Sequence, residues 1–239
     1  MDSVLTYDDV LDVNFGQASI CIDACFILAF LDSNDPRGDA VGNVLAKWHK
    51  DGICRIGIPV QVVSEVVHNL FKNFVLRAVV SATKIQLNAL RGRKYPLTEE
   101  DKLIGEQGFV KKLLRFAPSK VVLEIANGKR YSLPVSDLVK DFKKTFPAER
   151  AQLTPMYQHS IKIFNDYIAT LTDDFGFNVD ILDTNQSTKD VAVSYMALFQ
   201  LEIFDAMHLA TTFCNSYDYF ATLDSDFAHN LYSGGHQEY

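Results

Sequence analysis

The sequence lacks several features that mark particular classes of protein. No apolar run reaches the roughly 18 residues of a membrane span, and the start MDSVLTYDDVLDVNFG has neither the basic residues nor the apolar centre of a signal peptide. There are only four cysteines, without zinc-site spacing, and no internal repeat or low-complexity stretch. These absences predict a cytoplasmic globular protein with free thiols and no membrane partner.

Charge is distributed unevenly along the chain. Residues 72–150 hold 17 of the 23 Lys and Arg but 8 of the 30 Asp and Glu, so their formal charge is +9 against −16 for the rest. Such an asymmetry favours binding to a polyanion or to an acidic partner. The basic residues that we expect to contact the phosphates of such a polyanion are Arg91, Arg93, Lys94, Lys111, Lys112, Arg115, Lys129 and Arg130.

Apolar runs and amphipathic segments alternate along the chain. Strands are predicted at about 19–23, 53–58, 178–182 and 219–223, with helices at about 35–50, 59–92, 136–146, 148–171 and 187–199, and others starting near Thr98 and before Asp205. This order predicts an α/β fold with a parallel sheet flanked by helices. Near Asn127-Gly128 the pattern predicts a β-hairpin. The aromatic residues expected in the core are Phe26, Phe30, Phe204, Phe213, Phe220 and Phe227.

Four acids stand at the ends of buried elements. Asp23 follows the first strand, Asp224 follows the last, Glu65 lies beside the apolar stripe of a helix, and Asp205 lies in the first turn of another. In parallel sheets such positions hold ligands and metals. Oxygen ligands suit one or two Mg²⁺ or Mn²⁺ ions, which would neutralise the carboxylates. Each acid taken alone also fits a structural role, as a helix cap, a backbone acceptor or a surface residue.

Four segments together resemble a PIN domain, the metal-dependent nuclease fold of VapC-type toxins in bacterial toxin–antitoxin pairs. The segments are IDACFILAFLDSNDP, IPVQVVSEVV, FDAMHLATTF and FATLDSDF, and the last two resemble the family most strongly. The resemblance implies a single PIN-like domain over residues 1–239. Its core would be about 17–74 and 155–230, with an insertion at about 75–154 that contains the predicted hairpin.

The resemblance also implies the roles of several residues. Asp23, Glu65, Asp205 and Asp224 become the catalytic, metal-binding cluster, and Asp226 becomes an additional acid near the metal. Thr222 matches a hydroxyl residue that often precedes the last acid, whereas Cys25 replaces the usual Ser, Thr or Asn. His208, like His68, is interpreted as a packed or hydrogen-bonded helix residue beside the site.

The implied function is a metal-dependent endoribonuclease in which a metal-activated water attacks an RNA phosphodiester. The resemblance suggests a toxin, with RNA, an antitoxin or inhibitor protein and a second copy of the chain as partners. Two alternatives remain open. One is a catalytically silent PIN-like scaffold that binds RNA or protein. The other is a phosphatase of the haloacid dehalogenase type, which would need an aspartate where this chain has Cys25.

Overall fold

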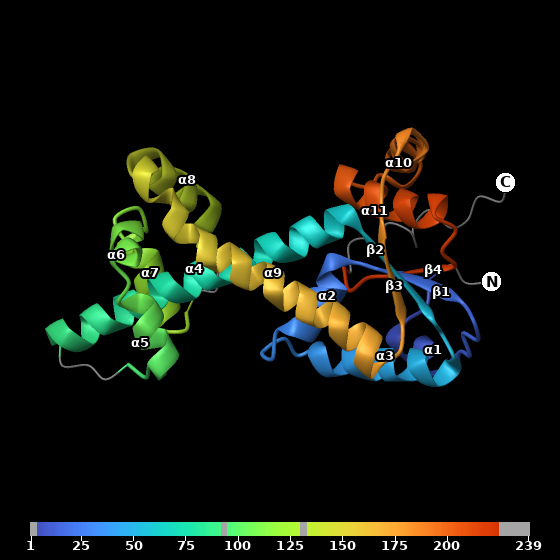
Figure 1. The fold of residues 1–239 in the computed structure, drawn as a ribbon, viewed down its shortest axis with the longest axis horizontal. Coiled ribbons are helices and arrows are strands. Elements are labelled where there is room, and N and C mark those ends of the chain that lie inside the picture. Colours follow the sequence, from blue (N-terminus) through green and yellow to red (C-terminus); the bar gives the residue numbers. More distant parts are fainter. Residues whose placement is uncertain (1–3, 92–94, 130–132, 225–239) are drawn as a thin grey trace. The chain divides into compact units, whose positions relative to one another are not determined.

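The chain divides into two compact units. A computed structural model describes residues 4–91, 95–129 and 133–224. The first unit, called the sheet unit, combines residues Met1–Val66 and Ile163–Tyr239, and the second, called the helical unit, is Val67–Lys162. Two long helices, α4 (Val60–Arg91) and α9 (Thr154–Ala169), contribute to both units (Figure 1). No helix in the described ranges is long and apolar enough to cross a membrane.

The sheet unit contains four parallel strands in the order β3-β2-β1-β4. Their bounds are β1 Ser19–Ile22, β2 Arg55–Pro59, β3 Asn178–Leu182 and β4 Tyr219–Ala221. In the register of the central strand, Cys21 is opposite Gly57 of β2 and Phe220 of β4. The sequence-based prediction of an α/β fold with a parallel sheet is therefore confirmed.

Helices cover the sheet from opposite sides. Helices α2 (Ala24–Leu31) and α3 (Gly38–Asp51) connect β1 to β2, and α10 (Gln186–Phe199) and α11 (Ile203–Cys214) connect β3 to β4. The two connections run in opposite directions along the sheet, so right-handed crossovers place them on opposite faces. Figure 1 shows α3 and α11 on opposite sides of the strands. The strand order reverses beside β1 and β4, which makes their carboxyl ends the expected ligand-binding position.

Local packing and helix capping explain why particular residues occupy several positions of the sheet unit. All four side chains of β1 are buried, as expected for a central strand covered on both faces. A Cβ at Gly57 would lie 2.6 Å from the ring of Tyr217, so only glycine allows this ring to pack on β2. A short helix, α1 (Tyr7–Asp12), begins with a capping box between Thr6 and Asp9.

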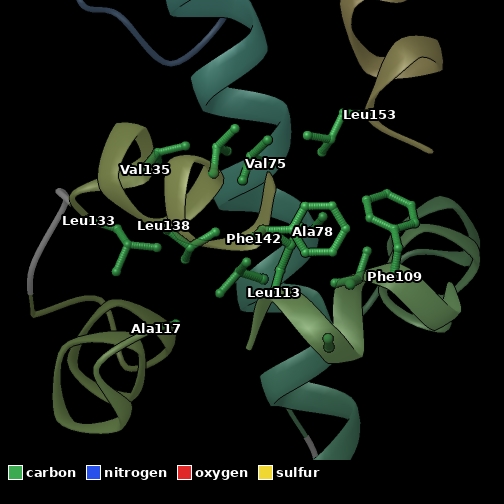
Figure 2. Packing of buried hydrophobic residues seen from close by; sticks show 14 of the residues in the cluster. Val75, Ala78, Phe109, Leu113, Ala117, Leu133, Val135, Leu138, Phe142 and Leu153 are labelled. Carbon is green, nitrogen blue, oxygen red and sulfur yellow. The ribbon is translucent and has the colours of Figure 1, made fainter. Parts of the chain in front are cut away.

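The helical unit has its own hydrophobic core. Its shorter helices are α5 (Glu99–Gly105), α6 (Gly108–Leu113), α7 (Ser119–Ala126) and α8 (Val135–Thr145). They pack around the middle of α4, and Figure 2 shows Phe142 and Leu113 beside Ala78 of that helix. Phe142 and Leu113 are completely buried. A core of this size accounts for the compactness of the unit.

The predicted β-hairpin near Asn127-Gly128 is wrong. Residues Ser119–Ala126 form α7, which buries Val122 and Ala126 one turn apart. Asn127-Gly128 ends this helix instead of reversing a strand. Gly128 has a φ of 71°, its N–H bonds the carbonyl of Ile125, and the next N–H bonds the carbonyl of Glu124. This is the Schellman arrangement, which uses the left-handed conformation that glycine adopts without strain.

Two further predictions need correction. The helix expected at about 148–171 has three parts, a 3₁₀ segment Pro147–Leu153, then α9, then a π-helical turn Thr170–Asp174. Among the aromatic residues predicted in the core, Phe204 and Phe213 are 65% and 64% exposed. They lie in the terminal turns of α11, where fewer neighbours cover them. Phe227 lies outside the described residues.

Candidate metal centre

Asp23 lies where a buried strand passes directly into a helix. Strand β1 ends at Ile22, and Asp23 caps α2 by accepting a hydrogen bond from the backbone N–H of Ala24 at 2.6 Å. Aspartate is a preferred residue at this cap. The cap therefore holds the carboxylate at the carboxyl end of β1, beside the point where the strand order reverses.

Four donors surround the Asp23 carboxylate. Oδ1 accepts from Ala24 N and lies 3.2 Å from Nδ1 of His208, while Oδ2 accepts from the Cys25 thiol at 3.0 Å and the Thr222 hydroxyl at 2.9 Å. They match the roughly four lone-pair positions of a carboxylate. Burial pushes the pKa of Asp23 up, but the hydrogen bonds from His208 and Cys25 outweigh burial and hold this pKa below its ordinary value.

Cys25 and Thr222 join the ends of β1 and β4 behind Asp23. The sulfur of Cys25 accepts a hydrogen bond from Leu223 N at 3.0 Å, and the hydroxyl of Thr222 accepts one from Asp224 N at 3.0 Å. Burial and the charge of Asp23 raise the pKa of Cys25 to about 12. The thiol is therefore protonated at neutral pH and donates its hydrogen bond to Asp23.

Glu65 and His208 add two more ligand groups. One ligand atom of each of Asp23, Glu65 and His208 lies within 4.8 Å of the others. Strand β2 leads directly into α4 at Val60, so Glu65 stands beyond the carboxyl end of β2 as Asp23 does at β1. Glu65 is exposed, whereas His208 is only 3% exposed. The group therefore has one solvent-facing carboxylate and one buried imidazole.

Asp205 and Asp224 lie near this group. Burial and the charge of Asp224 raise the pKa of Asp205, the charge of Asp23 also raises it, and His208 acts in the opposite direction. Asp205 is half-buried in the first turn of α11, and Asp224 is exposed just after β4. The folded chain thus disfavours the charged form of Asp205, an electrostatic cost that a bound cation would relieve.

The structure brings only some of the predicted site residues into the group of close ligand atoms. Asp23, Glu65, Asp205 and Asp224 lie at the ends of elements as expected, but the group within 4.8 Å contains His208 and not Asp205. His208 follows Asp205 by three residues, on the next turn of α11. From the sequence, this spacing places His208 beside the site, but the residue is interpreted there as packed or hydrogen-bonded and not as a possible ligand. Asp226 lies outside the described residues.

The basic residues predicted to contact RNA belong to several local environments. Lys112 pairs with Glu149, and both Lys112 and Arg115 lie over the ring of Phe146, at 5.3 and 5.9 Å from its centroid. Lys111 and Lys129 are exposed. Arg91 ends α4, and its side chain is not described; Arg93, Lys94 and Arg130 lie outside the described residues.

The donor groups fit a divalent cation. Two oxygens on opposite sides of one such ion lie about 4–5 Å apart, which is compatible with the separation of the three ligand atoms. Nε2 of His208 is buried and has no hydrogen-bond partner among the described residues. A buried nitrogen of this kind costs free energy unless it binds something. Carboxylates with one imidazole suit Mn²⁺ or another transition ion better than Mg²⁺.

Comparisons of the chain with protein-family models, with curated proteins and with solved structures find no match.

Proposed function

We propose that this chain is a metal-dependent endoribonuclease with a PIN-like sheet unit. The observation that carries the proposal is the group of Asp23, Glu65 and His208, whose ligand atoms lie within 4.8 Å of one another. Asp205 and Asp224 supply more negative charge beside it. Parallel sheets bind ligands at this position, and carboxylates that raise one another's pKa favour a cation that neutralises them.

The residues of the centre would have different roles in ion binding, in orienting Asp23 and in proton transfer. Asp23, Glu65 and His208 would hold the ion, which when bound lowers the pKa of water and stabilises developing charge on a phosphate. Thr222 and Cys25 keep the Asp23 carboxylate oriented through their hydrogen bonds. Burial and the charge of Asp224 raise the pKa of Asp205, which makes it a candidate to carry a proton beside the ion.

A polyanionic substrate is supported by the charge of the rest of the chain. The acidic centre repels phosphates, so productive binding needs basic groups elsewhere, and residues 72–150 carry a formal charge of +9. RNA as the substrate follows the resemblance to PIN domains. The same resemblance extends the proposal to a toxin that an antitoxin protein inhibits, and to pairing of two copies of the chain.

A catalytically silent scaffold that binds RNA or protein is the second candidate. The four donors around the Asp23 carboxylate favour it, because a cation must displace a donor to reach this group. The scaffold and the nuclease differ in one measurable respect. The nuclease needs a cation at Asp23 and Glu65, and the scaffold does not.

The test is cleavage of single-stranded RNA with Mn²⁺, Mg²⁺ or EDTA. Asp23→Asn and Glu65→Gln should each lower the rate by at least about 100-fold, since even partners of metal ligands contribute about 10–100-fold. Asp39→Asn is the matched control, because Asp39 is an exposed acid in the first turn of α3. Mn²⁺ should also raise the melting temperature of the unsubstituted protein but not of Glu65→Gln.

Two outcomes would overturn the nuclease proposal. One is cleavage that survives Asp23→Asn in protein free of host nucleases. The other is RNA that stays intact with every cation while RNA binding persists, which is the result expected of the scaffold.

A further inference from the structure

The helical unit contains a pocket that the candidate metal centre does not use. Its volume is about 230 Å³, and residues of α4, α8 and α9 line it. The floor is apolar, with Phe71 of α4 stacked on Tyr157 of α9 at 3.7 Å between ring centroids and 8° between ring planes. Val135 and Val139 of α8 complete the floor and are buried.

The rim of this pocket is basic. Lys72 of α4 and Lys140 and Lys143 of α8 line it, together with His68 and Ser136. Lys140 and Lys143 follow Ser136 at helical spacing, which places the three on one face of α8. Among the described residues, no negatively charged side chain lines the pocket.

Some cations of the helical unit are paired with carboxylates, whereas the three lysines of the pocket are not paired with any described carboxylate. Arg77 pairs with Glu100 and Asp101, and Lys102 pairs with Glu99. In the described ranges, by contrast, Lys72, Lys140 and Lys143 have no carboxylate within salt-bridge distance. Like charges that converge without a counterion repel one another, and a bound anion removes that cost.

Two observations show that the cations are close enough to act together. Lys143 Nζ lies 6.0 Å from the ring centroid of Tyr157, over the floor. Burial lowers the pKa of His68, and the charges of Lys72 and Lys143 lower it further. The positive groups of α4 and α8 therefore share one local field above the aromatic floor.

We propose that this pocket binds a phosphate group of a single-stranded RNA, with the lysines on the phosphate and the partly exposed ring of Tyr157 beneath the attached nucleoside. Ammonium groups bind phosphate as point charges. A basic rim over aromatic rings is the combination by which proteins hold single strands without reading sequence. The choice of RNA as the source of the phosphate rests on the proposed function, whereas the anion site rests on the pocket itself.

Binding of a labelled single-stranded RNA in EDTA tests the inference without any contribution from cleavage. The variant Lys140→Ala with Lys143→Ala removes two rim charges. The control Lys120→Ala with Lys144→Ala removes two exposed charges of the same unit that do not line the pocket. Circular dichroism verifies the fold of both variants.

The expected result follows from counterion release. Loss of two phosphate contacts should reduce the slope of log affinity against log salt by about 1.4 and weaken binding by about 25-fold at about 0.1 M salt. The control should retain most of its affinity and slope. If both variants lost RNA affinity equally, the loss would reflect net charge alone, and the inference would be overturned. The inference would also be overturned if neither variant lost affinity.

Other ligands give different results in the same experiment. One such result is that inorganic phosphate stabilises the unsubstituted protein but not the Lys140/Lys143 variant, while the two proteins bind RNA with equal affinity. In that case the pocket binds a small phosphate, and the assignment to RNA is wrong. If polyglutamate binds in the same way and RNA does not, the partner is an acidic protein. If the rim variant loses RNA affinity while cleavage does not depend on Asp23, the pocket inference holds and the nuclease proposal fails.

Discussion

Replacement of the Cys25 thiol tests whether donors around Asp23 stabilise the sheet unit. Cys25→Ala removes the hydrogen bond from sulfur to Asp23 Oδ2 and the acceptor of Leu223 N. Cys25→Ser keeps a donor and an acceptor at the same position. Cys54→Ala is the matched control, because Cys54 is exposed.

The size of the effect follows from these two bonds. A hydrogen bond to an ionised group contributes about 1.5–3 kcal/mol, and a thiol donor belongs at the lower end of that range. The bond from Leu223 N adds about 1 kcal/mol. Cys25→Ala should therefore reduce the free energy of unfolding by about 2.5 kcal/mol, or roughly 5–10 °C in melting temperature. Cys25→Ser should stay within about 1 kcal/mol of the unsubstituted protein.

Fluorescence of the single tryptophan during urea unfolding is a suitable assay. Trp48 belongs to the sheet unit, is 2% exposed and stacks on Phe26, so its emission reports on this unit. Because the folded pKa of Asp23 is depressed, its stabilising effect is present above the unfolded pKa and is lost as pH falls through the folded pKa. The penalty of Cys25→Ala should thus be smaller near pH 3 than near pH 7. A penalty below about 0.5 kcal/mol, or one independent of pH, would refute this account of the donors.

Two further predictions concern stability. In protein free of divalent cations, Asp205→Asn should raise the free energy of unfolding at neutral pH, because burial and the charge of Asp224 raise the pKa of Asp205 and so disfavour its charged form in the folded chain. Asp23→Asn should lower the free energy of unfolding, because the pKa of Asp23 is depressed. Urea unfolding measures both changes, and a loss from Asp205→Asn or a gain from Asp23→Asn would contradict the reasoning. Phe142→Ala should cost the helical unit about 3–5 kcal/mol, because this ring is completely buried in its core. Urea unfolding followed by far-ultraviolet circular dichroism measures this loss of stability. Phe146→Ala is the control and should cost less, because Phe146 is only half-buried. A cost of Phe142→Ala below about 1 kcal/mol would contradict the prediction.

Elements with a clear period were predictable from the sequence. Strand β3 has the predicted bounds Asn178–Leu182, and α4 extends over Val60–Arg91, close to the prediction. Helix α2 was not predicted, because nearly every residue of ACFILAFL is apolar and such a run shows no helical period. The hairpin failed for a related reason. The valines near Val121 suit a strand, but their burial in the helical unit selects a helix.

The positions of the four acids followed from the sequence, but the membership of the ligand group did not. Strand ends can be read from apolar runs, so Asp23 and Asp224 could be placed at one sheet edge. Whether His208 or Asp205 of α11 approaches Glu65 depends on how that helix is rotated against α4, and spacing within one helix carries no such information. The basic pocket was missed because its lysines come from helices distant in sequence.

The donors around Asp23 set a condition on how the centre can bind a cation. The bond from Ala24 N belongs to the cap of α2, and the bond from Thr222 ties β4 to Asp23, so neither is lost without local disruption. His208 differs, because its second nitrogen is buried without a partner among the described residues. A reorientation of this ring that frees Asp23 for a cation would therefore disrupt less of the surrounding structure than loss of the Ala24 or Thr222 hydrogen bond. A cation bound here would have to accept both a carboxylate and an imidazole as ligands, and Mn²⁺ meets that condition better than Mg²⁺.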